Sequence, residues 1–520
     1  MKPALWSGVF VLLVLTLAPA YWKALHNPLA GTYHDDGIYL VTAKALASGQ
    51  GYGIISLPEP MIQTKYPPVY PWLLSLVWRV TPSFPQNLTA LLSVSLIASL
   101  AWMLAVYALA KQEGLSQSAI FFVIAMSASS MWTLGLSTIA LSETTFAALC
   151  TGSLALLKLA EKKRSKWLIV FSALLSGLAF LTRSIGITIP AAALIWLLYK
   201  RCREAVLMFG IVALVVIAPW FIWCKLHGSP TGWVESYYSA RSYGINSVLL
   251  SFSLGQKANI IGTNLLYLFL SPASLLNLAP SPIWLTLTVS ALLFFALLRN
   301  SCKHFCLLPI VLITYAVALT CTCGGLGVRY AAPVFPLALI VAVQGPKLKN
   351  RLTLTLVTVA AGLLLCHSVF RLYVSADQIA AGHKAWTSED NDPAELRNLT
   401  SWIQANVPQG KIVSANLDPL FYLYTGHKTV RGFAPKYYES LYKTGTAKQR
   451  PVGTADDLRR ELRTNHVEYL VIMPDKDFLE IPFFQKLEKQ LIRDRPSAFH
   501  RIYKGKLPGY EVIAVDWEKL

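Results

Sequence analysis

Two adjacent carboxylates, Asp35 and Asp36, follow the first strongly apolar segment of the chain. A carboxylate beside a membrane-spanning segment is costly unless it faces water or a site, so this pair is a functional candidate. The same stretch contains His34, Tyr39 and Lys65. Carboxylates and cations close together in an apolar chain indicate either ion pairing or a site for a polar ligand.

Further charges occur at the ends of later apolar segments. Glu143 begins one segment, Arg183 follows another, and Arg329 and Tyr330 precede a third. If the fold brings these positions to one membrane face, they form either a buried salt-bridge network or a site for an anionic, polar ligand. Because the carboxylates and cations occur together, we favour the site.

The composition explains why these charges are costly. Hydrophobic residues make up 54% of the chain, charged residues only 14%, and the mean hydropathy is +0.48. Apolar runs of spanning length recur between short charged loops as far as residue 373, which predicts a polytopic α-helical membrane protein. The net charge of +19 comes from Lys and Arg in those loops. This pattern indicates membrane topology and argues against a nucleic-acid-binding protein, which needs a continuous basic face.

Lys and Arg in short loops favour the cytoplasmic side, which fixes the orientation of the spans. If every basic loop is cytoplasmic, the chain must cross the membrane an even number of times between two such loops. This rule predicts about eleven spans, at 4–22, 88–110, 117–134, 141–160, 167–181, 186–199, 205–223, 282–298, 305–322, 330–344 and 352–373. Two further segments, Val69–Val80 and Ile260–Leu278, are predicted to be interfacial or re-entrant helices. The first would reach only about 18 Å, against a hydrocarbon core of about 30 Å.

The predicted organisation has two parts. Residues 1–373 form the transmembrane domain, in which 34–80 is the first outer loop with its juxtamembrane helices. Residues 374–520 are charged and mixed, and they predict an extracytoplasmic α/β domain with strands at 411–415, 469–473 and 511–515 and helices at 392–406, 456–465 and 482–491. This tail has no GxGxxG or P-loop motif, so ligand binding or gating and a purely structural cap both stay open for it.

The order of the short motifs resembles the GT-C superfamily of membrane glycosyltransferases, in particular the bacterial branch related to protein O-mannosyltransferases and lipid A aminoarabinose transferases. The resemblance covers the whole chain in layout. It rests on Asp35 and Asp36 with Tyr39, the turn KYPPVYP at 65–71, Ser142 and Glu143 before Phe146, Leu181 to Arg183 with Gly186, and Arg329 and Tyr330 followed by Pro333 and Pro336.

This resemblance implies an inverting transfer of a sugar from a polyprenyl-monophosphate donor, such as undecaprenyl phosphate, to a lipid, glycan or protein acceptor. The reaction would take place at the periplasmic face of the cytoplasmic membrane. The roles implied are catalytic base for Asp35, with Asp36 as its partner; donor phosphate binding for Lys65, Arg183, Arg329 and Tyr330; and substrate orientation for Glu143, Tyr39 and His34.

The resemblance does not imply a metal-binding residue in this stretch. The aminoarabinose enzymes have a glutamate directly before Lys-Pro-Pro, whereas this chain has Gln63, Thr64, Lys65 and Tyr66. His227 resembles a family metal ligand in placement, but a lone loop histidine is more often a solvated side chain. We therefore assign no cofactor and leave a divalent metal open.

Two other functions stay open from the sequence. A flippase or other transporter of lipid-linked glycans would line a pathway with outer-face charges, but it would also need polar residues at mid-membrane depth, where this chain is almost entirely apolar. An O-antigen ligase or polymerase would use a diphosphate-linked donor, and it would not require an acidic pair after the first span.

Overall fold

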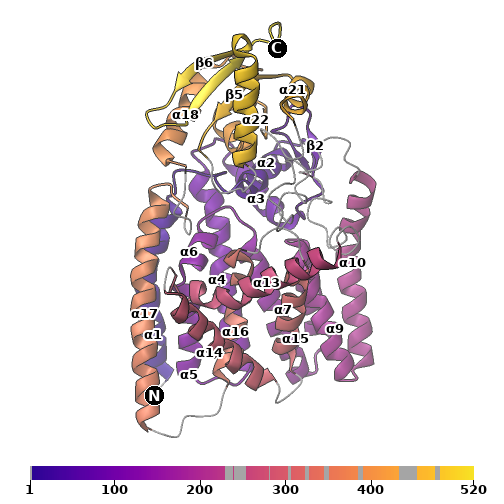
Figure 1. Cartoon of the computed structure of the whole chain (residues 1–520). Helices are drawn as coiled ribbons and strands as arrows, with labels where there is room; N and C mark the ends of the chain where they lie inside the picture. The colour runs from indigo at the N-terminus through magenta and orange to yellow at the C-terminus, as the bar shows by residue number, and fades with distance from the viewer. Residues whose placement is uncertain are drawn as a thin grey trace.

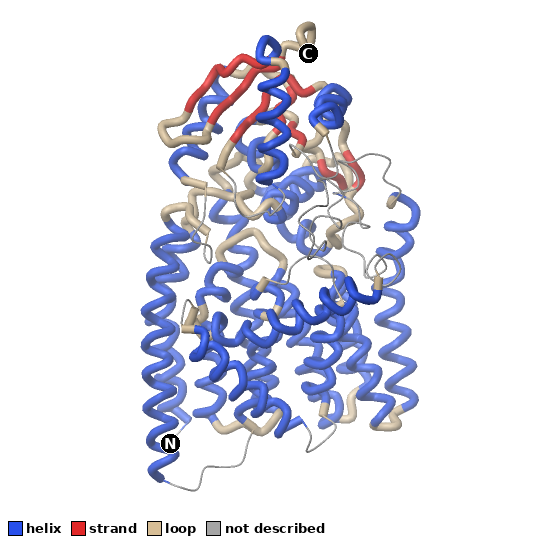
Figure 2. The backbone as a smooth tube through the Cα atoms, viewed as in Figure 1, coloured by secondary structure: helices blue, strands red, loops and turns tan. Residues whose placement is uncertain are grey.

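A bundle of apolar helices carries a small α/β domain at one end, and the N-terminus lies at the other end of the bundle (Figure 1). The computed structural model describes residues 3–228, 238, 253–279, 282–301, 306–321, 327–344, 351–384, 391–431, 454–474 and 481–520. The five-stranded sheet lies in the α/β domain, whereas the bundle is helical (Figure 2).

The bundle helices are built from the apolar runs seen in the sequence. They are α1 (Pro3–Leu25), α4 (Leu88–Gln112), α5 (Gln117–Ala128), α6 (Met131–Ser137), α7 (Glu143–Lys163), α8 (Lys166–Phe180), α9 (Thr188–Tyr199), α10 (Arg203–His227), α13 (Leu254–Leu275), α14 (Ile283–Ser301), α15 (Leu307–Thr320), α16 (Phe335–Val343) and α17 (Arg351–Ala380). Large apolar side chains point outward from them, and Leu12, Leu104, Leu214 and Leu363 are 65–72% exposed. An apolar outer surface of this kind fits lipid rather than water.

Six helices in the described part of the chain are long and apolar enough to cross a membrane, or seven if the bent pair α5 and α6 forms one span. Four shorter apolar helices lie at Lys166–Phe180, Ser184–Tyr199, Leu307–Thr320 and Val328–Val343. The protein is therefore a multi-pass membrane protein with a C-terminal domain, and the count of eleven spans stays a prediction.

Two predicted segments differ from the structure in detail. The run at 117–134 is not one straight helix, because α5 and α6 meet at a bend of 63°. α13 has the length and hydropathy of a span, but Figure 1 shows it lying across the bundle, as an interfacial helix would. α13 begins at Leu254, before the predicted start at Ile260, and it continues through Pro272 to Leu275.

The first loop lies between the bundle and the α/β domain (Figure 1). It contains α2 (Asp35–Ala47), the antiparallel strands β1 (Gly53–Ile54) and β2 (Met61–Ile62), and α3 (Val69–Val80). The bounds of α3 match the predicted short helix, and its 12 residues are too few to cross a bilayer.

The α/β domain follows α17, which continues to Ala380, beyond the predicted boundary at 373. A mixed sheet runs in the order β4-β3-β5-β7-β6, with β3 parallel to β4 and β5, and β7 antiparallel to β5 and β6. Its elements are α18 (Pro393–Asn406), β3 (Ile412–Ser414), α19 (Asp418–Thr425), β4 (Thr429–Val430), α21 (Ala455–Thr464), β5 (Val467–Ile472), α22 (Ile481–Asp494), β6 (Phe499–Lys504) and β7 (Glu511–Val515).

Both faces of this sheet are covered. Val471 and Val512 face one apolar cluster with residues of α18 and α19, whereas their neighbours Leu470 and Ile513 face a second cluster with residues of α21 and α22. This alternation follows from the two-residue period of a strand.

The α/β domain docks directly on the first loop. The Thr429 backbone N–H donates to the Ser56 carbonyl over 2.8 Å, and Lys428 donates to the Ile55 carbonyl over 2.6 Å. A Cβ on Gly37 would lie 2.7 Å from the Pro419 Cβ, so only glycine allows this approach of α2 to α19. The first loop is therefore held from both sides, by the bundle and by the C-terminal domain.

The topology gives a first prediction. A reporter fused after Lys506 should read outside the cytoplasm and one fused after Lys163 should read inside, because the two positions lie at opposite ends of the molecule and the basic loop at 161–166 favours the cytoplasm. Paired phosphatase and fluorescent-protein fusions measure this. A cytoplasmic signal from the Lys506 fusion would contradict the orientation.

Candidate active site

Asp35 is the first residue of α2, at the end of the bundle that carries the α/β domain, and the helix dipole favours negative charge at this position. Its Oδ1 accepts a hydrogen bond from the Tyr66 hydroxyl over 2.6 Å, and its Oδ2 accepts one from Arg329 Nη2 over 2.8 Å. The loop after the first helix and a segment 294 residues later thus meet at one carboxylate.

Arg329 lies in a short 3₁₀ turn, η3 (Val328–Tyr330), just before α16. The Tyr315 hydroxyl on α15 donates to the Tyr330 carbonyl and anchors this turn. The guanidinium of Arg329 also donates to the Tyr330 hydroxyl over 3.0 Å and lies 4.9 Å from the centre of its ring. This stacking holds the arginine plane in place beside Asp35.

Glu143 is the first residue of α7 and is almost completely buried. Its Oε1 lies 2.9 Å from Arg183 Nη1 and 3.8 Å from Arg329 Nε. Neither contact has hydrogen-bond geometry, since both carboxylate oxygens lack an aligned donor among the described residues. Glu143 therefore balances the charge of the two arginines, whose N–H groups donate to Asp35, Tyr330 and Ser142 instead.

Arg183 sits in the turn between α8 and the 3₁₀ turn η1 (Ser184–Ile187) that leads into α9. It donates to the Ser142 hydroxyl over 3.0 Å and lies 5.5 Å from the centre of the Tyr330 ring. The turn is tight, and a Cβ on Gly186 would lie 2.7 Å from the Ala179 backbone. The Val69 N–H donates to the Leu181 carbonyl, which ties this turn to the start of α3.

Lys65 and Tyr66 come from the turn before α3. Gln63 Oε1 accepts from the backbone N–H groups of both residues, over 2.9 and 3.2 Å, and this shapes the turn. Lys65 Nζ lies 5.5 Å from the centre of the Tyr66 ring. The Tyr39 hydroxyl pairs with Ser142 over 2.9 Å, and the Tyr39 ring packs against Tyr66.

The charges of this cluster interact through a mostly buried environment. Burial raises the pKa of Asp35, but the charges of Arg329 and Lys65 and the Tyr66 hydrogen bond outweigh burial and hold the pKa well below its usual range. Among the residues that the structure describes, three cations (Lys65, Arg183, Arg329) face two carboxylates (Asp35, Glu143), an excess of one positive charge.

Asp36 is turned away from this cluster. Its Oδ2 accepts from the Gly31 N–H over 2.6 Å and its Oδ1 accepts from the Tyr33 N–H over 3.0 Å. Burial raises the pKa of Asp36 to about 6, although the backbone hydrogen bonds oppose the rise. The structure therefore gives the two adjacent carboxylates different surroundings, and Asp36 braces the loop that presents Asp35.

His34 also points elsewhere. Its Nε2 lies 2.9 Å from Asp418 Oδ1 at the start of α19, and the Tyr238 hydroxyl donates to Asp418 Oδ2 over 2.5 Å. Burial lowers the pKa of His34, although Asp418 opposes this. His34 has φ 62°, an uncommon value for a residue other than glycine, and its contact with the α/β domain offsets that strain.

His227 lies at the end of α10, with its Nδ1 3.1 Å from the Trp223 carbonyl. In the described ranges no three His, Cys, Asp or Glu side chains lie close enough to hold a metal ion. Asp35 and Glu143 each face an arginine in this structure.

The sequence interpretation missed three contributors. Tyr66 bonds Asp35, Ser142 bonds both Arg183 and Tyr39, and Gln63 shapes the turn before α3. Tyr66 and Ser142 are the sequence neighbours of the predicted site residues Lys65 and Glu143. This proximity in the sequence could have indicated that they belong to the site.

Comparisons with known proteins give one family match and several similar folds. Residues 65–223 match the family model described as dolichyl-phosphate-mannose-protein mannosyltransferase. The fold is similar to that of ArnT from Cupriavidus metallidurans bound to undecaprenyl phosphate, with 14% identity, 98% of each chain covered and a TM-score of 0.61. A search of the curated proteins gave no significant match.

Two archaeal structures share the fold as well. An Archaeoglobus fulgidus oligosaccharyltransferase in complex with Zn and sulfate has 14% identity and a TM-score of 0.57, with 96% of this chain and 73% of the other covered. The oligosaccharyltransferase AglB from the same organism, with an inhibitory peptide and a dolichol-phosphate, has 11% identity and a TM-score of 0.57, with 97% and 74% covered. Together with the family match, these structures confirm the resemblance to GT-C membrane glycosyltransferases.

The different surroundings of the two carboxylates give a second prediction. Asp36→Asn should lower the thermal unfolding midpoint, because an amide can accept only one of the two backbone N–H bonds, and an unsatisfied buried donor costs about 1–3 kcal/mol. Asp35→Asn should lower it much less, since Arg329 keeps Glu143 as a partner. Unfolding of the detergent-purified variants, followed by intrinsic fluorescence, measures the difference. Equal midpoints for the two variants would contradict the bracing role of Asp36.

Proposed function

We propose that the protein is an inverting glycosyltransferase that moves a sugar from a polyprenyl-monophosphate donor to an acceptor at the membrane face next to the C-terminal domain. That face is the periplasmic side of the cytoplasmic membrane. The acceptor is a lipid, a glycan or a protein.

One observation carries this proposal: the ion-paired cluster in which Asp35 and Glu143 share Arg329. Its single excess positive charge matches the single negative charge of a phosphate diester. Its groups come from the ends of helices, which is where the phosphate of a membrane-embedded lipid would lie. The relatives that were solved with undecaprenyl phosphate and dolichol-phosphate support this class of donor.

In the proposed reaction an acceptor hydroxyl attacks the anomeric carbon of the sugar. The new C–O bond forms as the bond between that carbon and the phosphate oxygen breaks, and the hydroxyl proton passes to Asp35. Polyprenyl phosphate leaves with the electron pair and gains one negative charge. Arg183, Arg329 and Lys65 stabilise that charge as it develops, and a single displacement of this kind inverts the anomeric carbon.

Asp35 is a weak base while Arg329 and Tyr66 bond it, because its pKa is below the usual range. A bound donor phosphate would compete for the same guanidinium and would also bring negative charge close to Asp35. Both effects raise the pKa of the carboxylate. Donor binding would thus activate the base, and Glu143 would hold the arginines in place during the exchange.

A transporter of lipid-linked glycans is the competing function. The charged cluster favours the transferase, because Glu143, Arg183 and Arg329 lie at the ends of helices rather than along them. A ligase that uses a diphosphate-linked donor differs only in the donor, so monophosphate and diphosphate donors tested side by side separate these two transferases.

The role of Asp35 gives a third prediction. Asp35→Asn should reduce transfer by about 10²- to 10⁴-fold, the usual contribution of a general base, while donor binding is kept or improved because a negative charge near the phosphate is lost. The assay is sugar transfer from a purified polyprenyl-phosphate donor by the solubilised protein, with donor binding measured separately.

Asp456→Asn is the matched control, since Asp456 is an exposed carboxylate on α21 of the α/β domain and is not part of the cluster. It should transfer normally. Full transfer by Asp35→Asn would remove Asp35 from catalysis.

The arginines give a fourth prediction. Arg183→Ala and Arg329→Ala should each weaken donor binding by about 10- to 150-fold, since a charge-assisted hydrogen bond contributes about 1.5–3 kcal/mol. Lysine at either position should restore part of the loss, because it keeps the charge without the planar fork. Arg79→Ala is the control, since Arg79 is exposed at the end of α3. Normal donor binding by both alanine variants would mean that the arginines only pair with Asp35 and Glu143.

A further inference from the structure

A second charged site lies at the opposite end of the bundle from the Asp35 cluster. It is a pocket of about 480 Å³ between the ends of α7, α8, α9 and α10. α7 links the two places, because it begins at Glu143 and ends at Lys163, and its 21 residues span about 31 Å. The pocket is therefore about one hydrocarbon thickness from the cluster, at the other membrane surface.

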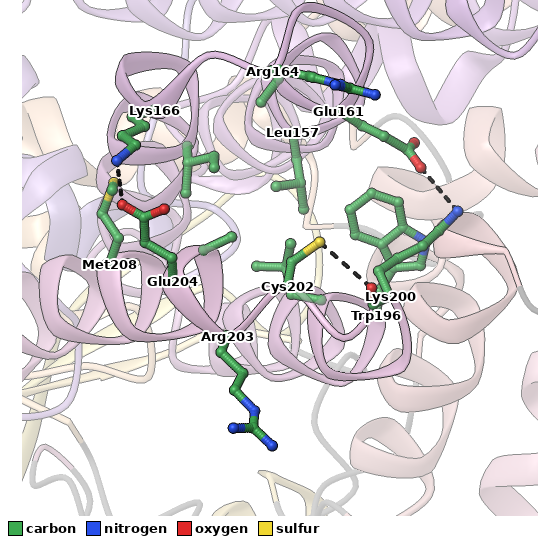
Figure 3. Close-up of a pocket in the computed structure, with 14 residues that line it drawn as sticks. Leu157, Glu161, Arg164, Lys166, Trp196, Lys200, Cys202, Arg203, Glu204 and Met208 are labelled. Atoms are coloured by element: carbon green, nitrogen blue, oxygen red, sulfur yellow. Dashed lines mark hydrogen bonds and ion pairs between the residues drawn. The ribbon is translucent and has the colours of Figure 1, made fainter.

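The walls of the pocket are apolar and its rim is charged. Leu157, Ile169, Leu197 and Met208 contribute to the walls, as does the buried indole of Trp196. Two ion pairs frame the rim: Lys166 with Glu204 on one side, and Lys200 with Glu161 on the other (Figure 3). The Lys200 ammonium also lies over the Trp196 ring.

Two arginines add charge that these pairs do not neutralise. Arg164 and Arg203 line the pocket, and neither makes an ion pair with a residue in the described part of the chain. The rim thus has four cations (Arg164, Lys166, Lys200, Arg203) and two carboxylates (Glu161, Glu204), an excess of two positive charges. Arg164 follows the last residue of α7 with φ 52°, a left-handed conformation that favours glycine. An arginine is therefore present at a position where the backbone alone would favour glycine.

We propose that this pocket binds an anionic phospholipid from the leaflet opposite the C-terminal domain, with the headgroup at the cationic rim and an acyl chain against the apolar walls. An apolar wall below a cationic rim matches a lipid better than it matches a free anion, which has no use for the wall. Basic pockets between membrane helices on the cytoplasmic side bind anionic headgroups in this way.

The test uses the full-length protein, purified in detergent and titrated with phosphatidylglycerol or with phosphatidylcholine of the same acyl chains. Bound lipid is counted by native mass spectrometry. The wild type should bind phosphatidylglycerol more tightly than phosphatidylcholine, and excess inorganic phosphate should not displace it. Removing both charges in Arg164→Gly/Arg203→Ala should weaken phosphatidylglycerol binding by about 30-fold, the equivalent of about 1 kcal/mol per arginine.

Glycine is chosen at 164 because it suits the positive φ, and Arg164→Gly alone should fold and lose part of the affinity. Lys111→Ala/Arg299→Ala is the control, since both residues are exposed at helix ends with basic loops but do not line the pocket. Equal binding of the two lipids by the wild type, unchanged binding by the pocket variants, an equal loss in the control, or displacement by phosphate would each overturn the proposal.

Discussion

The shared ion pairs among Asp35, Arg329, Glu143 and Arg183 are the interactions on which this end of the bundle depends. Moving two charges out of water is costly, and removing one partner leaves the other buried and uncompensated. Arg329 is shared with Glu143, which is shared with Arg183. These four side chains thus form a chain of alternating charges in which each charge has an opposite neighbour.

This chain of charges also explains how the scaffold is arranged. Asp35, Glu143 and Arg329 lie at the starts of α2 and α7 and just before α16, so rigid elements converge on one point and set the distances. α7 additionally connects the cluster to the basic rim at the other membrane surface. Its two ends carry opposite charge, acidic at Glu143 and basic at Lys162 and Lys163, as the helix dipole favours.

Much of this arrangement could be predicted from local patterns. The strands at 411–415, 469–473 and 511–515 were found within two residues as β3, β5 and β7, because alternation and β-branched residues are local signals. The count of spans predicted that Asp35, Glu143, Arg183 and Arg329 lie at the same membrane face. Strands β4 and β6 were missed: β4 has only two residues, and β6 is an edge strand with exposed, charged residues and a weak apolar pattern.

The orientation of individual side chains could not be predicted in this way. Nothing in the sequence near His34 indicates that its partner is Asp418, 384 residues later. Nor does the Asp35–Asp36 pair show which member faces the arginines, because that is decided by backbone N–H groups of Gly31 and Tyr33. Such choices depend on tertiary contacts rather than on periodicity.

The docking of the α/β domain on the first loop has a consequence for biosynthesis. The loop that presents Asp35 leaves the ribosome early, but its contacts with Asp418, Lys428 and Thr429 require residues made near the end of the chain. At 5–20 residues per second, that interval is roughly 20 to 80 s. During this time the nascent loop lacks its upper support, so its final shape is acquired only when the last domain has been translated and has folded onto it.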